Sequence, residues 1–313
     1  MAWTTDDVGI VAELVASLRH NKGNNWEFVA TLTVSLSLSQ GSQFQARMAT
    51  FPNLSEAYLH ALHQLWYNPQ YEHRGVTPDD MKDCEHPASK NPRWYFNKGA
   101  NVELVNFAMT IVEPSDREDI VTHSAQRNKI MYDYSAAETV MFDNGDLVNI
   151  KQLSKVWQTI ANPDGTINAN YGHMVYKLKD AGNSKFSDHF QSQWDWAKSR
   201  LLLLKSTNQS YLHFNRPQHQ WDENLDQPCC LNVQFQIRDD RLSLYVNMRS
   251  NDAVYGTPYN LLYFVKLMHR MLAELQAAKY PELTIGDLFY HTTSLHYYKK
   301  RADKVRDMLG LSE

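Results

Sequence analysis

The most regular alternation of hydrophobic and polar residues lies in the last third of the chain. From Cys229 to Ile237 hydrophobic residues alternate with polar ones, and the alternation resumes over 242–248 after the charged segment 238–241. A period of two is typical of strands with one face on the core, so this pattern predicts an antiparallel hairpin. The segment 260–278 is apolar over much of its circumference and predicts a largely buried helix, which Asn260 could cap.

Weaker patterns predict the other elements. Helical spacing appears in 6–20 and again in 54–68, and residues 29–38 alternate like a strand. The segment 70–100 holds three prolines and many turn formers, so we expect a long irregular loop there. Strands and helices in this order predict the α+β class, with a mixed or antiparallel sheet and packed helices.

Composition excludes several classes of protein. The 313 residues are 43% hydrophobic and 21% charged, which suits a folded protein with a substantial core rather than a disordered one. The 31 Lys and Arg against 35 Asp and Glu give a net charge of -4, which disfavours nucleic acid as a partner. We expect no membrane span, since no apolar run approaches 18 residues. No signal peptide and no disulfide framework are expected either, and both absences indicate a cytoplasmic protein.

Two adjacent cysteines are the first candidate for chemistry. Cys229 and Cys230 follow a proline at the start of the predicted hairpin. A buried cysteine acting as a small hydrophobic residue is the ordinary interpretation, and the pair lacks the second ligand pair of a zinc site. A reactive thiolate needs a nearby cation, which Arg216 or Arg249 could supply. Spacing alone leaves the reactive thiol open.

The segment 249–252 is the second candidate. An arginine fork followed by Ser250 could bind a phosphate group, although a solvated turn suits the same string equally well. The thirteen histidines show no metal-binding spacing, so we expect no metal site, and His296 alone is more often structural.

Five segments, in the same order, resemble motifs of the thymidylate synthase family. Residues 228–235 (PCCLNVQF) are similar to its nucleophile motif P-C-H-x-x-x-Q-F, and residues 249–260 (RSNDAVYGTPYN) to R-S-x-D-x-x-x-G-x-P-F-N. Residues 286–298 carry GDL and SLHYY at the spacing of G-D-F and D-x-H-x-Y, and residues 138–146 resemble E-x-x-x-F-x-x-G-D. The fifth segment matches W…A…G…Y-G through Trp157, Ala161, Gly165, Tyr171 and Gly172.

The resemblance implies both a fold and a chemistry. The family fold is an α/β sandwich with a mixed sheet and a long buried helix, and it forms a homodimer through the sheet. A cysteine thiolate adds to C6 of a pyrimidine nucleoside monophosphate, and C5 then attacks the one-carbon unit of 5,10-methylenetetrahydrofolate. Covalent activation of this kind divides a difficult substitution into easier steps.

The resemblance also implies a role for each matching residue. Cys229 would be the nucleophile, Glu138 the carboxylate that handles protons through ordered water, and Tyr171 a tyrosine linked to proton removal at C5. Asp252 joins this catalytic set and, with Gly256, contacts the folate pterin. The other matches are Arg249 and Ser250 with the phosphate, Asn260 with the base, His296 and Tyr298 with the sugar hydroxyl, Trp157 as an aromatic wall, and, more loosely, Arg74 as an N-terminal phosphate arginine.

Several positions depart from the family pattern. Cys230 replaces the histidine after the nucleophile, and Thr207-Asn208 stand where the family lends two arginines across the dimer. We expect residues 1–53 to be an N-terminal extension and 54–313 the catalytic domain, with an insertion near 76–105. Only 15 residues follow Tyr298, so the C-terminus looks shortened against relatives that continue into a segment closing over the folate.

These departures favour one reaction outcome over another. Attack of water on the transferred methylene gives a hydroxymethyl group, whereas reduction gives a methyl group. The missing closing segment favours a hydroxymethylase, and Asn260 favours a uracil nucleotide of the dUMP type. Trp157 could shield the methylene and favours methylation. Thymidylate synthase, a dCMP or CMP hydroxymethylase, and a non-catalytic nucleotide-binding relative remain the alternatives.

Overall fold

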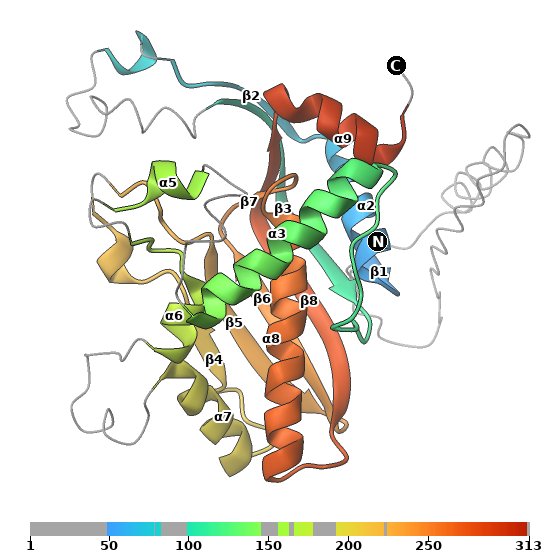
Figure 1. Cartoon of the computed structure of the whole chain (residues 1–313), viewed down its shortest axis with the longest axis vertical. Helices are drawn as coiled ribbons and strands as arrows, with labels where there is room; N and C mark the ends of the chain where they lie inside the picture. Colours follow the sequence, from blue (N-terminus) through green and yellow to red (C-terminus); the bar gives the residue numbers. More distant parts are fainter. Residues whose placement is uncertain are drawn as a thin grey trace, which may run out of the picture. The chain divides into compact units, whose positions relative to one another are not determined.

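The computed structural model describes residues 49–77, 79–82, 99–144, 156–162, 166–177, 192–221 and 224–311, all within one unit, Arg47–Glu313. The helix predicted over 6–20 and the strand over 29–38 lie outside these residues, as do Gly145, Asp146 and Gly165 of the motifs. The described part is α+β, as expected: a mixed sheet is packed against helices (Figure 1).

The sheet combines parallel and antiparallel neighbours. Its spatial order is β1-β3-β8-β6-β5-β4, with β2 added to β3 and β7 added to β8. Strands β6 and β8 run parallel, whereas β3 and β8, β5 and β6, and β4 and β5 run antiparallel. The bounds are β1 (Ala49–Phe51), β2 (Tyr71–Gly75), β3 (Gly99–Ile111), β4 (Tyr211–His213), β5 (Cys230–Arg238), β6 (Arg241–Met248), β7 (Asn251–Asp252) and β8 (Thr284–Tyr298).

The buried helix is the centre of the packing. Helix α8 (Thr257–Ala278) crosses the sheet and buries most of its hydrophobic residues (Figure 1). It begins three residues before the predicted start: Gly256 precedes it and Pro258 lies in its first turn, where proline costs no hydrogen bond. Asn260 is therefore not the cap. The other helices are α2 (Leu54–Tyr67), α3 (Ala125–Asn144), α5 (Val156–Ile160), α6 (Tyr171–Tyr176), α7 (Gln193–Leu203) and α9 (Ala302–Leu309).

The predicted hairpin is confirmed as β5 and β6, with one change of register. Residues 239–240 form its turn with positive φ, as a tight two-residue turn requires. A β-bulge between Cys230 and Asn232 changes the alternation, so Cys230 rather than Cys229 shares the buried face with Val233. The alternation predicted from the sequence is therefore wrong at Cys229, which lies just before β5.

The segment 70–100 is not loop throughout, contrary to the prediction. Residues 71–75 form β2, and β3 begins at Gly99. Tyr71 pairs with Glu103 in an antiparallel ladder, so pairing with a neighbour holds a polar segment extended against its local preference. Residues 99–105, which we expected in an insertion, form the first half of β3 beside β8.

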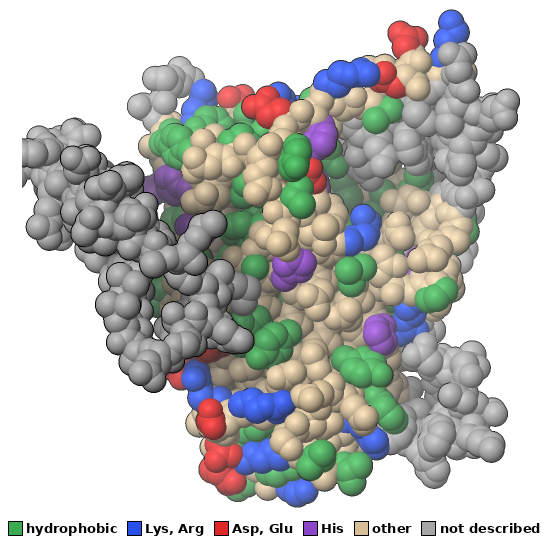
Figure 2. Space-filling view, turned by 180° about the vertical axis from the view of Figure 1, so that it is seen from behind, with side chains coloured by type: hydrophobic (Ala, Val, Ile, Leu, Met, Phe, Trp, Pro, Cys, Tyr) green, Lys and Arg blue, Asp and Glu red, His purple; other side chains and the backbone are tan. Residues whose placement is uncertain are grey.

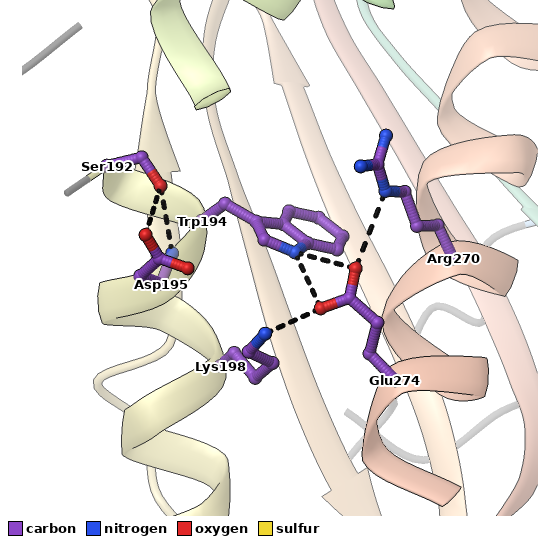
Figure 3. Close-up of polar contacts among 6 residues, drawn as sticks. All are labelled: Ser192, Trp194, Asp195, Lys198, Arg270 and Glu274. Carbon is purple, nitrogen blue, oxygen red and sulfur yellow. Dashed lines mark hydrogen bonds and ion pairs between the residues drawn. The ribbon is translucent and has the colours of Figure 1, made fainter. Parts of the chain in front are cut away.

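A polar cluster fixes α7 against α8 (Figure 3). Glu274 on α8 accepts hydrogen bonds from Trp194 Nε1 at 3.1 Å and from Lys198 Nζ at 2.6 Å, and Arg270 Nε approaches it at 3.5 Å. Ser192 caps the start of α7. These contacts hold α7 against α8, and α7 also lies beside β4 and β5, the strand that follows the candidate nucleophile.

The other face of the sheet is seen in Figure 2. Polar and hydrophobic side chains are mixed across its centre, and most charged side chains lie toward its ends. Along β6 and β8, Tyr245 and Phe289 alternate with buried residues and so lie on the face of the sheet opposite the core, where their rings stack at 4.4 Å between centroids. This face is therefore suited to a further contact.

Candidate active site

All twelve residues to which the family resemblance assigned a role in the site line one cavity of about 1550 Å³. They come from segments far apart in the chain: β2, α3, α5, α6, the loop before β5, β7, α8 and β8. The structure thus brings together Arg74, Glu138, Trp157, Tyr171, Cys229, Arg249, Ser250, Asp252, Gly256, Asn260, His296 and Tyr298.

Cys229 lies beside a guanidinium group. Arg249 Nη2 is 3.8 Å from the Cys229 Sγ, and the same side chain donates to the carbonyls of Pro228 (3.0 Å) and Gln227 (2.8 Å). Arg249 therefore fixes the loop that carries the thiol. Burial raises the pKa of Cys229, and the positive charge of Arg249 opposes that rise. The residue is a thiol in the free protein, with a cation in place to stabilise the thiolate.

The other cysteine belongs to the core. Cys230 is fully buried, and its backbone N–H donates to the Tyr171 hydroxyl at 3.0 Å. A glycine lets the tyrosine reach this place: a Cβ on Gly172 would lie 1.3 Å from the Phe142 carbonyl oxygen, so α6 can approach α3 only with glycine there. The Tyr171 ring packs on Phe142 at 5.3 Å between centroids. Its hydroxyl is thereby held next to the nucleophile loop.

Glu138 is a buried carboxyl group on α3. Burial raises its pKa to about 8, although a hydrogen bond from Tyr134 and the charge of Lys266 act in the opposite direction. Trp157 Nε1 donates to the Tyr134 hydroxyl at 2.5 Å. Tyr134 was not predicted from the sequence. It lies four residues before Glu138, on the same face of a helix, and this spacing could have identified it. A chain of hydrogen bonds therefore joins the aromatic wall to the carboxyl group.

A carboxylate from another strand lies near His296. Glu103 on β3 lies directly opposite His296 in the β3–β8 ladder. The Ser294 hydroxyl donates to Glu103 and lies 3.5 Å from His296 Nδ1, while His73 Nε2 contacts the second Glu103 oxygen at 2.8 Å. Burial lowers the pKa of His296, so its imidazole is neutral. Glu103 was not identified from the sequence, because its place opposite His296 depends on the pairing of distant strands.

Asp252 is already engaged on both oxygens. One oxygen accepts the backbone N–H groups of Val254 (2.9 Å) and Tyr255 (3.2 Å), and the other forms an ion pair with Arg301. The Arg301 guanidinium lies 4.3 Å from the centroid of the Tyr255 ring and 5.1 Å from that of Tyr298. Arg301, which was not predicted from the sequence either, therefore binds the carboxylate that we expected to contact the pterin.

The remaining predicted residues differ in how they are held. Asn260 lies in the first turn of α8, and its Nδ2 donates to Asn251 Oδ1 of β7 at 3.3 Å. A Cβ on Gly256 would lie 2.5 Å from the same oxygen, so this position requires glycine. Arg74 is mostly exposed at the cavity edge and pairs with Asp80 through both terminal nitrogens. Arg74 thus has a competing anion in this structure.

A second buried carboxyl group, which was not identified from the sequence, lines the same cavity. Asp226 lies three residues before Cys229 and is 5% exposed. Its Oδ2 accepts the backbone N–H of Ala169 at 2.8 Å. Burial raises its pKa to about 6, which is lower than that of Glu138.

Within the described residues, no group of three or more His, Cys, Asp or Glu side chains could hold a metal ion. None of the described helices combines the length and the apolar character needed to cross a bilayer.

Comparison with known proteins points to one family. The thymidylate synthase family model matches residues 118–312. The chain is 28% identical over 154 residues to the deoxycytidylate 5-hydroxymethyltransferase of Enterobacteria phage T4, covering 48% of this chain and 58% of that protein. It is 26% identical over 190 residues to the thymidylate synthase of Corynebacterium aurimucosum, covering 58% and 65%. The aligned part is thus less than two thirds of either relative.

The fold also has a solved counterpart. The thermostable thymidylate synthase A from Bacillus subtilis superposes with a TM-score of 0.56 at 16% identity, over 83% of this chain and 85% of that one. This similarity concerns the fold, and it agrees with the mixed sheet and the buried central helix.

Proposed function

The chain belongs to the thymidylate synthase family, and from this premise we propose that it transfers a one-carbon unit to C5 of a pyrimidine nucleoside monophosphate. The donor is 5,10-methylenetetrahydrofolate. The observation that carries the proposal is the Cys229 thiol, held beside Arg249 in a cavity that also contains Glu138 and Tyr171. A nucleophile, a cation and a buried acid in one cavity are the parts that covalent activation of a base requires.

Each side chain has a proposed task. The Cys229 thiolate adds to C6 of the base, and the electron pair of the C5–C6 bond moves toward O4. Glu138, protonated at neutral pH because of its raised pKa, supplies a proton toward that oxygen through water. Arg249 and Ser250 bind the phosphate group, and the neutral His296 accepts a hydrogen bond from the sugar hydroxyl. Carbon C5 then becomes the nucleophile that takes the one-carbon unit.

Asn260 supports a uracil base. Its amide can donate to O4 and accept from the N3–H of uracil, whereas a carboxylate can accept from the amino group of cytosine. We expect Asn260→Asp to shift the ratio of kcat/KM values for dUMP and dCMP toward dCMP by roughly 100-fold, because unpaired buried polar groups are costly. Steady-state kinetics with both nucleotides gives the ratio for one variant, so loss of folding cannot imitate the shift. A wild-type protein that prefers cytosine nucleotides would contradict the assignment.

The proposed product carries a hydroxymethyl group. Support comes from the hydroxymethyltransferases among the relatives and from Asp252, whose carboxylate is shared with Arg301 and two backbone N–H groups. A pterin with a weak anchor would leave the transferred methylene open to water. Reductive methylation is the second candidate, since Trp157, held by Tyr134, could shield the methylene from water.

One experiment separates these products. The protein is incubated with methylenetetrahydrofolate and with dUMP, dCMP, UMP or CMP in turn. The masses of the nucleotide products are then measured by mass spectrometry. We expect 5-hydroxymethyl-dUMP without dihydrofolate, whose formation is followed by its near-ultraviolet absorbance. A methylated nucleotide formed in step with dihydrofolate would identify a thymidylate synthase instead. No product from any nucleotide would favour the non-catalytic alternative.

We also propose a homodimer through the face of the sheet seen in Figure 2. The half-buried pair of Tyr245 and Phe289 supports this assignment, because stacked aromatic rings on an open face are typical of an interface centre. Sedimentation velocity should give the mass of two chains, and a monomer at micromolar concentration would contradict it.

A further inference from the structure

We propose that Asp226 is the general base that activates the water molecule attacking the methylene group on C5. This inference rests on the proposed hydroxymethyl transfer and assigns its last step to a residue that the earlier steps leave unused. Three observations support the inference. Asp226 lies in the cavity wall, backbone hydrogen bonds fix its orientation, and the other buried carboxyl group, Glu138, is protonated where Asp226 is ionised.

The carboxylate lies between the two segments that carry the reacting groups. Asp226 precedes Cys229 by three residues on one segment, and its partner Ala169 precedes Tyr171 by two residues on the other. The negative charge of Asp226 contributes to the raised pKa of Cys229, and the charge of Arg249 acts on Asp226 in turn. The carboxylate is therefore within electrostatic range of the thiol that bonds to C6.

The chemistry places the reacting carbon close to that thiol. Sulfur bonds to C6, C5 is the adjacent ring atom, and the methylene group is attached to C5. A water molecule that attacks this methylene must lie in the same part of the cavity as Cys229. Asp226 lines the same cavity, and its charge acts on the Cys229 thiol. The carboxylate is held still for the task, because backbone N–H groups of Ala169 and Asn168 bond to it. Two such bonds leave further lone pairs to accept a proton from water.

The two buried carboxyl groups that line the cavity, Glu138 and Asp226, differ in protonation. Burial raises the pKa of Glu138 to about 8 and that of Asp226 to about 6. At neutral pH Glu138 is mostly protonated and Asp226 mostly ionised. A pair of carboxyl groups whose environments separate their pKa values is typical of an acid and a base in one site. Of the two, Asp226 is the one able to take a proton from water at that pH.

The step balances without another reagent. The water oxygen bonds to the methylene carbon while one of its protons passes to the Asp226 carboxylate. The electron pair of the exocyclic double bond moves into the ring toward O4. Its return forms the C5–C6 double bond and breaks the C6–S bond, so Cys229 leaves as a thiolate. The products are the hydroxymethyl nucleotide and a protonated Asp226, which loses its proton to solvent.

Asp226→Asn tests this assignment, because the amide oxygen can still accept the Ala169 N–H while the basicity is lost. Enzyme in excess over 5-tritiated dUMP is mixed with methylenetetrahydrofolate, and a single turnover is followed. We expect tritium release at close to the wild-type rate and hydroxymethyl formation at least about 100-fold slower, as for loss of a general base. An added thiol should then capture the waiting methylene as a thioether. Asp133→Asn, on the exposed side of α3, is the matched control and should behave as wild type.

Other outcomes overturn the proposal. Unchanged hydroxymethyl formation would show that Asp226 is not the base. Loss of tritium release in a folded variant that still binds dUMP would give Asp226 a role before water attack. If the asparagine variant does not fold, Asp226→Ser, which keeps a hydroxyl acceptor, is compared in the same way. Failure of the wild-type protein itself to release tritium would instead contradict the proposed function.

Discussion

Cys229→Ala should abolish product formation, lowering kcat/KM by about 10⁴-fold or more, because Cys229 is the one thiol among the described residues that line the cavity. Arg249 would remain to hold the nucleotide phosphate, so we expect dUMP binding to persist. Single-turnover product analysis combined with calorimetric titration of dUMP measures the two quantities separately. A variant that binds the nucleotide but makes no product would identify Cys229 as the nucleophile.

Cys230→Ala is the matched control. Its side chain is fully buried behind the bulge of β5, so the substitution removes a small apolar group from the core. We expect a loss of about 1 kcal/mol in stability and only a modest change in kcat/KM. An inactive Cys230→Ala protein together with an active Cys229→Ala protein would show that the register of the whole site is shifted by one residue.

Glu138→Gln should lower kcat/KM by roughly 10²- to 10⁴-fold, because the amide cannot deliver a proton toward O4. The same variant should be more stable than the wild type at alkaline pH. Burial raises the folded-state pKa of Glu138 from 4.5 to about 8, so the folded protein holds this proton more tightly than the unfolded chain. Stability contributed in this way is present at low pH and is lost progressively as pH rises from about 5 to 8.

Thermal unfolding at several pH values measures this second effect. Between pH 6 and pH 9 the midpoint of the wild type should fall relative to that of Glu138→Gln by on the order of 5 °C, which corresponds to about 2 kcal/mol. Asp133→Asn, a variant of an exposed carboxylate on the same helix, controls for general effects of pH. A Glu138→Gln protein that becomes less stable than the wild type at pH 9 would contradict the buried acid.

The sequence allowed much of the site to be predicted, because motifs fix which residues must converge. The five segments predicted eleven residues and a looser match added Arg74, and the structure places all twelve around one cavity. The hairpin was predictable from a period of two, which reflects burial of one face of a strand. The bulge after Cys230 was not predictable, because the sequence pattern does not show where a strand takes in one extra residue. That residue determines which of the two cysteines is buried.

Contacts between distant strands account for what the sequence did not predict. Strand β2 is polar and reads as loop, and only its pairing with β3 makes it extended. Glu103 lies opposite His296 in the β3–β8 ladder, and Arg301, from the segment after β8, forms an ion pair with Asp252. Asp226 is three residues from Cys229, yet nothing in the local pattern shows that it is buried in the cavity wall. Such residues become visible only when the topology is known.

Release of tritium from C5 of dUMP tests the central claim most directly, because it requires covalent activation of the base and no assumption about the product. With methylenetetrahydrofolate present, the wild-type protein should release tritium into water, and Cys229→Ala should release none. Tight binding of dUMP by the wild-type protein without any release of tritium would contradict one-carbon transfer at C5.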